Sequence, residues 1–280
     1  MPPTVASPVI VDSAGVTDVG RKRSSNEDHF VVATVSKAVA IGESSLPDAA
    51  LVNRFGASTG HLFAVADGVG GRPDGDVASQ WTVEELLDYL REAAGCFQGL
   101  DTANEDELLA RLENAVRTVH ARLMKEYGGE HAFIPASTLT MVLLVWPRAY
   151  LVHVGDSRAY VFRRRRLQRL TRDQTFGEYM LAAGAWTEAQ ATKPGPATTL
   201  ASAIGGTDLT PVVGLIDLEP GDSLLLCTDG LTKHVTEARL AAVLEGSDDA
   251  RAVARQLVDE ALADGGSDNV TVVVVRTGDA

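Results

Sequence analysis

The stretch STLTMVLLVWPRAYLVHVGDSRAYVFR (137–163) contains three runs of aliphatic, aromatic and β-branched residues with no helical segment between them. Pro147-Arg148 separates the first run from the second, and Gly155-Asp156-Ser157 separates the second from the third. Spacers this short allow only antiparallel pairing, because a parallel crossover needs about a dozen residues or more. The stretch therefore predicts part of an antiparallel sheet.

Similar β-type runs occur on both sides of this stretch. They are HFVVATV (29–35), HLFAVAD (61–67), DSLLLCTD (222–229) and NVTVVVVR (269–276). In three other segments, about 76–95, 105–127 and 249–263, apolar residues recur with the period of an amphipathic helix. Closely spaced strands together with a few long helices predict an α+β fold, in which helices cover antiparallel sheets.

Length and composition fit one folded domain. The chain has 280 residues, of which 45% are apolar and 22% charged, with 26 Gly, 11 Pro and 2 Cys, and these values exclude disorder, collagen and a disulfide scaffold. We predict a single domain over 1–280, with a structured core at about 12–276 and a flexible segment at 1–11. Two stretches rich in Gly, Pro, Ser and Thr, 42–60 and 175–210, are predicted to be loops, the first as an insert for an unnamed partner.

The charge of the chain limits its partners. Lys and Arg number 25 and Asp and Glu 38, a formal net charge of −13, so the long-range field repels nucleic acid. There is no signal-peptide pattern, and no apolar run approaches the ~18 residues that span a bilayer. Cys96 and Cys227 lie far apart, which favours reduced thiols in a reducing compartment. We therefore expect a cytoplasmic monomer with no nucleic-acid or membrane partner.

Four aspartates stand where β-type runs meet turns. Asp67, Asp156 and Asp229 end such runs, and Asp268 precedes one. Carboxylates at strand ends can converge at one edge of a sheet, where their mutual repulsion favours a bound cation. Oxygen ligands suit Mg²⁺ or Mn²⁺, whereas no cysteine or histidine pattern supports zinc. Each motif alone is also typical of an ordinary turn, so only their joint occurrence is informative.

The residues around two such motifs add detail. DGVGG (67–71) lets the backbone approach an ion closely, and the Gly68 carbonyl could be a ligand, although a tight turn explains the motif as well. RKRSSNEDH (21–29) places Arg23, Glu27 and Asp28 together. An arginine can hold a phosphate by two hydrogen bonds, and the carboxylates could orient metal-bound waters. A solvated loop is the alternative interpretation.

Arginine occupies four consecutive positions, 163–166, between two β-type segments. This position predicts an exposed hairpin turn, where charge is tolerated. A second interpretation is a docking site for acidic or phosphorylated protein segments. The sequence leaves both interpretations open.

Six short motifs occur in one order: RSSNED (23–28), DGVGG (67–71), GDSR (155–158), RDQT (172–175), TDGLT (228–232) and SDN (267–269). This set resembles the metal-dependent Ser/Thr protein phosphatases of type 2C, in their compact bacterial form, from about Val16 to the carboxyl terminus. The resemblance implies a four-layer α-β-β-α sandwich, in which two antiparallel sheets pack face to face. It also implies two Mn²⁺ or Mg²⁺ ions at one edge of the sandwich.

The resemblance assigns roles to the residues of these motifs. Asp67 matches the carboxylate that bridges both metals, and Gly68 matches the carbonyl ligand. Asp229 and Asp268 match the remaining metal-binding carboxylates, and Arg23 matches the phosphate-binding arginine. In such a site a hydroxide that bridges the two metals attacks phosphorus and displaces a serine or threonine oxygen.

Other matched residues surround this set. Glu27, Asp28 and Asn269 match the second shell, where side chains hold metal-bound water. Val69 stands where many eukaryotic members have a histidine that is a candidate general acid. Water or another residue must then protonate the leaving group.

A third metal ion is a further feature of the family. Asp156 matches one of its ligands, but Lys233 stands where a second carboxylate is usual. An ammonium group disfavours a cation at that position. A third ion would therefore depend on Asp156 and Asp229.

The segment 175–202 corresponds to a mobile flap beside the active site in this family. Thr187, Lys193 and Pro194 stand where many bacterial members have a threonine and a His-Pro pair. Its Ala, Gly, Thr and Pro content agrees with a lid, and an ordinary surface loop is the alternative.

These observations predict an enzyme that hydrolyses phosphoserine and phosphothreonine in proteins and opposes a bacterial Ser/Thr kinase. One alternative is a non-catalytic module that binds phosphoproteins, against which the presence of Asp67, Asp229 and Asp268 argues. A second is a regulatory phosphatase dedicated to one phosphorylated anti-anti-sigma partner, although the chain leaves no room for the usual sensor domain. Nucleotide binding is disfavoured because no GxxxxGK[ST] motif occurs.

Overall fold

The computed structural model describes residues 9–37, 58–69, 75–93, 105–128, 134–193 and 195–279, and every structural statement concerns these residues. Several predicted features lie outside them. These are residues 1–8 of the amino-terminal segment, residues 42–57 of the predicted insert, Gly70 and Gly71, Cys96, and Pro194.

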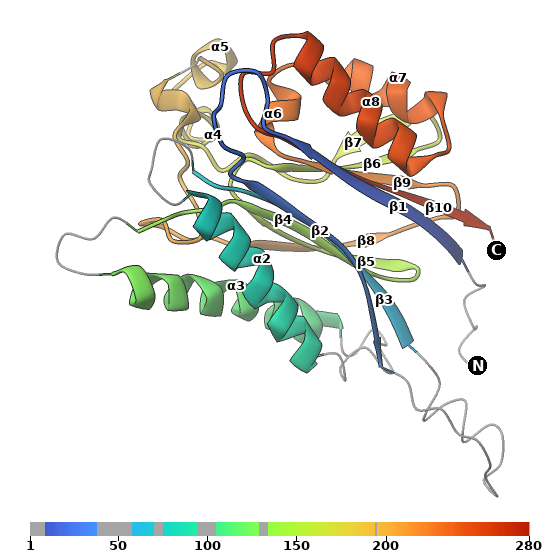
Figure 1. The fold of residues 1–280 in the computed structure, drawn as a ribbon. Coiled ribbons are helices and arrows are strands. Elements are labelled where there is room, and N and C mark those ends of the chain that lie inside the picture. Colours follow the sequence, from blue (N-terminus) through green and yellow to red (C-terminus); the bar gives the residue numbers. More distant parts are fainter. Residues whose placement is uncertain are drawn as a thin grey trace, which may run out of the picture.

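Two five-stranded sheets lie face to face in the centre of the molecule (Figure 1). The first consists, in order across the sheet, of β1 (Val9–Asp18), β10 (Val270–Asp279), β9 (Ser223–Cys227), β6 (Arg158–Arg163) and β7 (Arg166–Arg169). The second consists of β2 (Asp28–Lys37), β3 (Ser58–Asp67), β4 (Leu139–Val145), β5 (Arg148–Val154) and β8 (Val212–Asp217). Every neighbouring pair is antiparallel, and β4 pairs with β5 across Pro147-Arg148 as predicted. The pairing predicted across Gly155-Asp156-Ser157 is wrong, because the chain crosses there from β5 of the second sheet to β6 of the first.

Helices cover the outer faces of both sheets. The helices α2 (Gly75–Ala93) and α3 (Glu105–Tyr127) lie on the second sheet, and α7 (Glu237–Gly246) and α8 (Ala250–Ala263) lie on the first (Figure 1). Four shorter helices, α4 (Phe176–Ala182), α5 (Glu188–Ala191), the 3₁₀ helix η2 (Pro196–Thr198) and α6 (Asp229–Thr232), occupy connections. The predicted α+β fold with four α-β-β-α layers is confirmed.

Both faces of the central strands are buried. In β9, Leu225 packs against the helices of the first sheet, whereas Leu226 packs between the sheets with Phe63 and Val273. A strand with two buried faces needs apolar residues at consecutive positions. This explains why the central strands of this chain are continuous apolar runs rather than alternating patterns.

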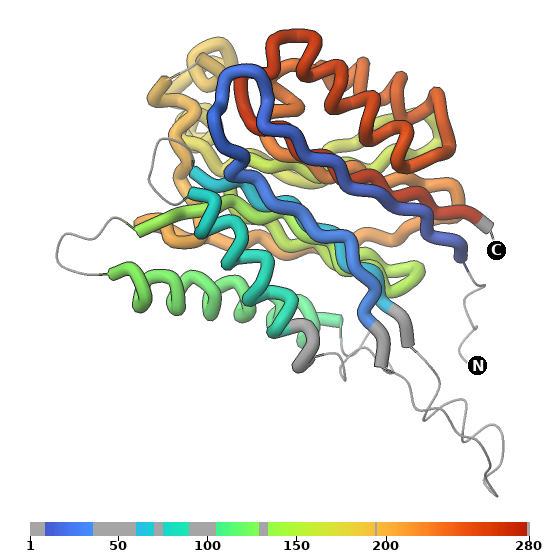
Figure 2. Tube along the Cα trace, in the orientation of Figure 1, coloured from blue at the N-terminus to red at the C-terminus, as the bar shows by residue number. Residues whose placement is uncertain are grey.

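The predicted elements agree with the structure where the apolar signal is long. All seven β-type runs form strands, and the three periodic segments form α2, α3 and α8 with ends that differ by two residues or fewer. The predicted start of the core at residue 12 is wrong, since β1 begins at Val9 and pairs with β10 (Figure 2). The first and last described residues therefore lie side by side.

The prediction of an irregular loop over 175–210 is also wrong. The segment contains α4, α5 and η2, and β8 follows it directly at Val212. These elements have three to seven residues each, too few to show a periodic pattern. Among the described helices, none is both long and apolar enough to cross a membrane.

Replacement of Leu226 by alanine tests the packing between the sheets. Leu226 is fully buried there, so Leu226→Ala is expected to lower the free energy of unfolding by about 2–5 kcal/mol in urea denaturation. Ile10→Ala is the matched control, because its side chain is 57% exposed and the loss should stay near ~0.5 kcal/mol. Equal losses in the two variants would contradict the assigned packing.

Candidate metal centre

Five aspartates from different segments meet at one end of the sandwich. Asp28 begins β2 and lies opposite Asp67, the last residue of β3. Asp156 follows β5, Asp229 begins α6 directly after β9, and Asp268 precedes β10. Burial raises the pKa of Asp67 well above its usual range, and the negative charges of the other four raise it further. The predicted convergence of these carboxyls is therefore present in the fold.

Asp28 joins the two sheets through hydroxyl groups. Its Oδ2 accepts hydrogen bonds from Thr228 Oγ1 at 2.8 Å and from Thr271 Oγ1 at 2.7 Å. Thr271 lies in β10 of the first sheet and Thr228 directly follows β9 of that sheet, whereas Asp28 begins β2 of the second sheet. Its Oδ1 is buried without a hydrogen-bond partner in the described structure. Burial raises the pKa of Asp28 to about 7, even though the two hydroxyls lower it.

Asp229 has a glycine neighbour for a packing reason. A side chain at Gly230 would overlap the backbone carbonyl of Asn269, so α6 can start this close to β10 only with glycine at that position. The DG pair, which alone is typical of a turn, thus begins a helix at the end of β9. Asp229 Oδ1 is buried and has no hydrogen-bond partner within the described residues.

Two cationic side chains contact these carboxyls. Lys233 Nζ lies 2.6 Å from Asp229 Oδ2 and 2.7 Å from Asp268 Oδ2, and Arg23 Nε lies 2.7 Å from Asp268 Oδ1. Burial alone would raise the pKa of Asp268, but Lys233 and Arg23 outweigh it and lower that pKa. Lys233 therefore forms ion pairs with two of the residues predicted to bind the metal pair. Its positive charge also disfavours a third ion at Asp156.

The donor set fits hard divalent cations. In the described part of the chain, no group of three or more Asp, Glu, His or Cys side chains lies in an arrangement ready to hold a metal ion. However, Asp28 and Asp229 each keep one buried oxygen without a partner, and burial and neighbouring charge raise the pKa of Asp156 to about 8. A divalent cation bound to carboxylate oxygens would give buried oxygens a partner and would offset the repulsion that raises the pKa of Asp156. The nearby Cys227 is a poor ligand, because burial raises the pKa of its thiol to about 12.

Asn269 holds the loop between β1 and β2 against this centre. Its Oδ1 accepts from the backbone N–H of Glu27 at 2.9 Å, and its Nδ2 donates to the carbonyls of Val19 at 2.9 Å and Ser25 at 2.8 Å. Asn269 itself is buried. Because Arg23 lies on the loop that Asn269 fastens, the amide also limits where this guanidinium can lie.

Gly68 brings two other segments together. Its N–H donates to the Glu27 carbonyl at 3.0 Å, and a side chain at Gly68 would overlap the Gly75 carbonyl at the start of α2. Burial raises the pKa of the Glu27 carboxyl, while Arg23 opposes this shift. Gly68 thus lies between the Arg23 loop and α2, beside Asp67.

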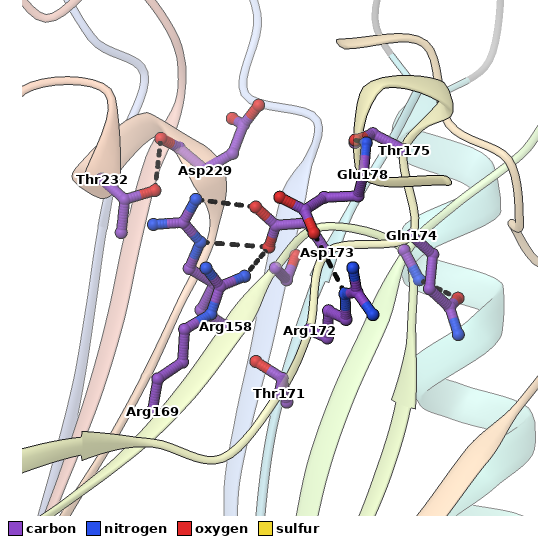
Figure 3. Close-up of polar contacts among 12 residues, drawn as sticks. Arg158, Arg169, Thr171, Arg172, Asp173, Gln174, Thr175, Glu178, Asp229 and Thr232 are labelled. Atoms are coloured by element: carbon purple, nitrogen blue, oxygen red, sulfur yellow. Dashed lines mark hydrogen bonds and ion pairs between the residues drawn. The ribbon is translucent and has the colours of Figure 1, made fainter. Parts of the chain in front are cut away.

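Arg158 and Asp173 form a further ion pair that the sequence analysis missed (Figure 3). Arg158 Nε donates to Asp173 Oδ1 at 3.0 Å and Arg158 Nη2 to Oδ2 at 2.7 Å, and Arg169 also contacts Asp173. Figure 3 shows the pair beside Asp229, and Asp173 adds to the raised pKa of this carboxyl after burial. The motifs GDSR and RDQT contain opposite charges, which is the signal that the sequence offers. Their spacing does not show that Arg158 and Asp173 form an ion pair.

The predicted flap, 175–202, is helical at several points. Thr175 Oγ1 accepts from the Glu178 N–H at 3.3 Å and caps α4, and the Thr187 N–H donates to Gln190 Oε1 at 2.9 Å at the start of α5. A side chain at Gly177 would overlap the Ala191 carbonyl, so α4 and α5 pack closely. Lys193 is exposed after α5. The mobility of this segment stays a prediction.

Comparison with known proteins gives the same assignment as the motifs. A family model described as "Protein phosphatase 2C" matches residues 47–264. The chain belongs to the protein phosphatase 2C family. This agrees with the resemblance that the six ordered motifs predict.

Individual members of the family are similar over most of the chain. The Mycobacterium tuberculosis Ser/Thr protein phosphatase PstP is 33% identical over 214 residues, which are 76% of this chain and 40% of PstP, so the chain spans less than half of that relative. The Streptococcus agalactiae Ser/Thr phosphatase structure has a TM-score of 0.75 and 26% identity, and covers 95% of this chain and 99% of its own. The catalytic domain of PstP, solved in complex with 2 manganese ions, has a TM-score of 0.70 and 29% identity, with 97% and 100% covered.

Removal of the Asn269 amide is expected to loosen the Arg23 loop. Asn269→Ala deletes three hydrogen bonds to buried or half-buried groups, so the free energy of unfolding should fall by about 1–3 kcal/mol in urea denaturation. Hydrogen exchange at the Glu27 amide should accelerate. Asn114→Ala, at an exposed position of α3, is the control and should change neither quantity by much. Unchanged exchange at Glu27 would contradict this assignment.

The raised pKa values predict how stability depends on pH without divalent metal. The pKa of Asp28 is raised to about 7 and that of Asp156 to about 8, so between pH 6.5 and 8 the folded chain binds more protons than the unfolded chain. Stability must then fall as pH rises, by up to about 1.4 kcal/mol per pH unit for each group that stays protonated. Below pH 6.5 the lowered pKa values of histidines such as His153 oppose this trend.

Urea denaturation in EDTA from pH 6.5 to 8 measures this slope. Asp156→Asn should flatten it, whereas Asp259→Asn at an exposed position of α8 should leave it unchanged. Mn²⁺ should also reduce the slope, because a bound cation offsets the ionised carboxyls. A stability that rises with pH over this range in EDTA would show that these carboxyls are not buried in protonated form.

Proposed function

We propose that this chain is a metal-dependent phosphatase that acts on phosphoserine and phosphothreonine in proteins. The main support is the meeting of five aspartyl carboxyls beside an arginine, at one end of a sandwich of the protein phosphatase 2C family. The relatives reported above are named Ser/Thr phosphatases. We further propose one catalytic domain over 1–280, with 175–202 as the flap.

The metal ligands that we propose are Asp67, the Gly68 carbonyl, Asp229 and Asp268. The buried, unpartnered Oδ1 of Asp229 supports this assignment, as does the structure of the PstP catalytic domain with 2 manganese ions. Two Mn²⁺ or Mg²⁺ ions held by these residues would lower the pKa of a bound water enough to supply the nucleophile, and would offset the charge of the phosphate.

The chain itself binds and orients the phosphate. The Arg23 side chain is 37% exposed, and its Nε is held by Asp268, so part of the guanidinium faces solvent next to a proposed ligand. A guanidinium in this position can donate two hydrogen bonds to phosphate oxygens. Asn269 fastens the loop that carries Arg23. We propose that the Glu27 carboxyl and the unpartnered Oδ1 of Asp28 accept hydrogen bonds from water.

The side chain of Val69 has no proton to donate to the leaving group. Its backbone N–H is already used, because it donates to the Ala136 carbonyl at 2.8 Å. We therefore propose that solvent protonates the departing serine or threonine oxygen.

The substrates that we propose are proteins phosphorylated by a bacterial Ser/Thr kinase. Support comes from the phosphatase names of the relatives and from a site that can hold both metal and phosphate. The monomeric state and the cytoplasmic location stay predictions. No specific observation favours a non-catalytic phosphoprotein-binding module over the enzyme.

Hydrolysis of p-nitrophenyl phosphate and of a phosphothreonine peptide tests this function. Both reactions should require Mn²⁺ or Mg²⁺ and stop in EDTA. Asp67→Asn should lower kcat by more than ~100-fold, since loss of a ligand should exceed the 10–100-fold effect of a residue that only supports a ligand. Asp106→Asn, on the first turn of α3, is the control and should retain full activity. Calorimetric binding of the phosphopeptide to metal-loaded protein without turnover would instead support the binding module.

A further inference from the structure

A groove opens along one side of the sandwich, and none of the five clustered aspartates lines it. The strand β7 is the last strand of the first sheet and β8 the last strand of the second, so each has an edge that pairs with no described strand. Between them lies a groove of about 910 Å³. An unpaired strand edge is a template for pairing with another extended chain.

The floor of the groove is apolar. Leu151 and Val161, which line it, belong to the cluster between the sheets, and the lining residues Leu170 and Ile216 are partly buried and pack against that cluster. Gly214 of β8 leaves open space, because no atom lies within 4 Å of the position that a side chain there would take. Val212, the first residue of β8, lies next to the lining residues of this strand along the chain and is 49% exposed. An extended segment with apolar side chains could therefore cover this floor.

The rim of the groove is basic although the chain as a whole has a charge of −13. Arg163, Arg164, Arg166 and Arg169 line it, and Asp217 is the one acidic lining residue among those described. Within the described residues Arg166 makes no ion pair or side-chain hydrogen bond. Arg164, whose side chain is 78% exposed, pairs with the half-buried Glu219, and such surface pairs contribute about 0–1 kcal/mol.

The turn between β6 and β7 has arginine at two positions whose backbone conformation is unfavourable for this residue. Arg164 and Arg165 have φ angles of 50° and 65°, in the left-handed region. Glycine and asparagine are the usual residues of such hairpin turns, and other L-residues cost about 1–2 kcal/mol each there. The solvated-turn interpretation of the arginine run explains its exposure but not the choice of arginine over these residues.

The groove follows β7 and the part of β8 from Gly214 to Asp217. Arg169 pairs with Tyr160, and Val212 pairs with His153, which precedes Asp156 by three residues. The Arg163–Arg166 turn and Asp217 lie at the other end. The six residues of β8 span ~20 Å at ~3.3 Å each, the length of an extended segment of about six residues.

We propose that this groove binds an extended acidic segment of a partner protein, which pairs with the free edge of β8. Acidic side chains of the segment contact Arg164 and Arg166 on the rim, and alternate apolar side chains cover the floor at Gly214. A strand places successive side chains on opposite sides, so a sequence that alternates acidic and apolar residues satisfies both surfaces. This docking does not depend on the phosphatase activity.

Fluorescence anisotropy with a fluorescein-labelled peptide of four Glu-Val repeats tests the proposal on the full chain. The wild type should bind it, and Arg164→Glu/Arg166→Glu should weaken binding at least tenfold. Arg251→Glu/Arg255→Glu, at exposed positions of α8, changes the net charge equally and should alter the affinity less than twofold. Gly214→Val, which adds no charge but fills the floor, should also weaken binding at least tenfold. Unchanged p-nitrophenyl phosphate hydrolysis and urea stability would show that the variants fold.

Four outcomes would overturn the proposal. Equal losses in the groove and α8 variants would mean that only long-range charge acts. Equal binding of a peptide of four Lys-Val repeats would show that the arginines on the rim do not select acidic side chains. Equal binding of an oligothymidine of the same charge would indicate a general anion site. A dimer in sedimentation that the groove variants dissociate would mean that a second copy of this chain occupies the groove.

Discussion

Repulsion among buried carboxyls is the constraint around which this structure is organised. Asp28, Asp67, Asp156, Asp229 and Asp268 lie at one end of the sandwich, and burial together with neighbouring negative charge raises the pKa of the first four. Lys233 and Arg23 offset part of this charge at Asp229 and Asp268. The remaining charge can be offset by protonation or by divalent cations, which makes a cation site a physical consequence of the arrangement.

The same place also holds the two sheets together. Asp28 of the second sheet accepts hydrogen bonds from Thr228 and Thr271 beside the first, and Asn269 fastens the loop that connects β1 with β2. Gly68 and Gly230 let backbone segments approach where any side chain would overlap a carbonyl. The polar contacts of the site therefore also stabilise the fold. The geometry of the site is set by strands and helices whose other parts are buried in the core.

How much of the structure the sequence predicts depends on the length of each element. The seven apolar runs and the helices at 75–93, 105–127 and 250–263 are visible because burial demands many apolar residues in a row or at helical spacing. The strands β1 and β8 and the helices α4 to α7 were missed, since they are short or half-exposed and their stability comes from neighbours. Likewise Asp67, Asp229 and Asp268 were indicated by strand ends, whereas the Arg158–Asp173 pair had no such signal.

The sequence by itself determined seven of the strands, the antiparallel hairpin at Pro147-Arg148, the set of acidic motifs and the family to which they belong. Only the tertiary structure decided which groups touch, namely that Lys233 lies between Asp229 and Asp268, that Asp28 is held by Thr228 and Thr271, and that the arginine run borders an apolar groove. The reason is physical. Burial of apolar surface acts on each segment through its own composition, but a contact between residues 35 to 243 positions apart depends on how the layers stack, which no local pattern encodes.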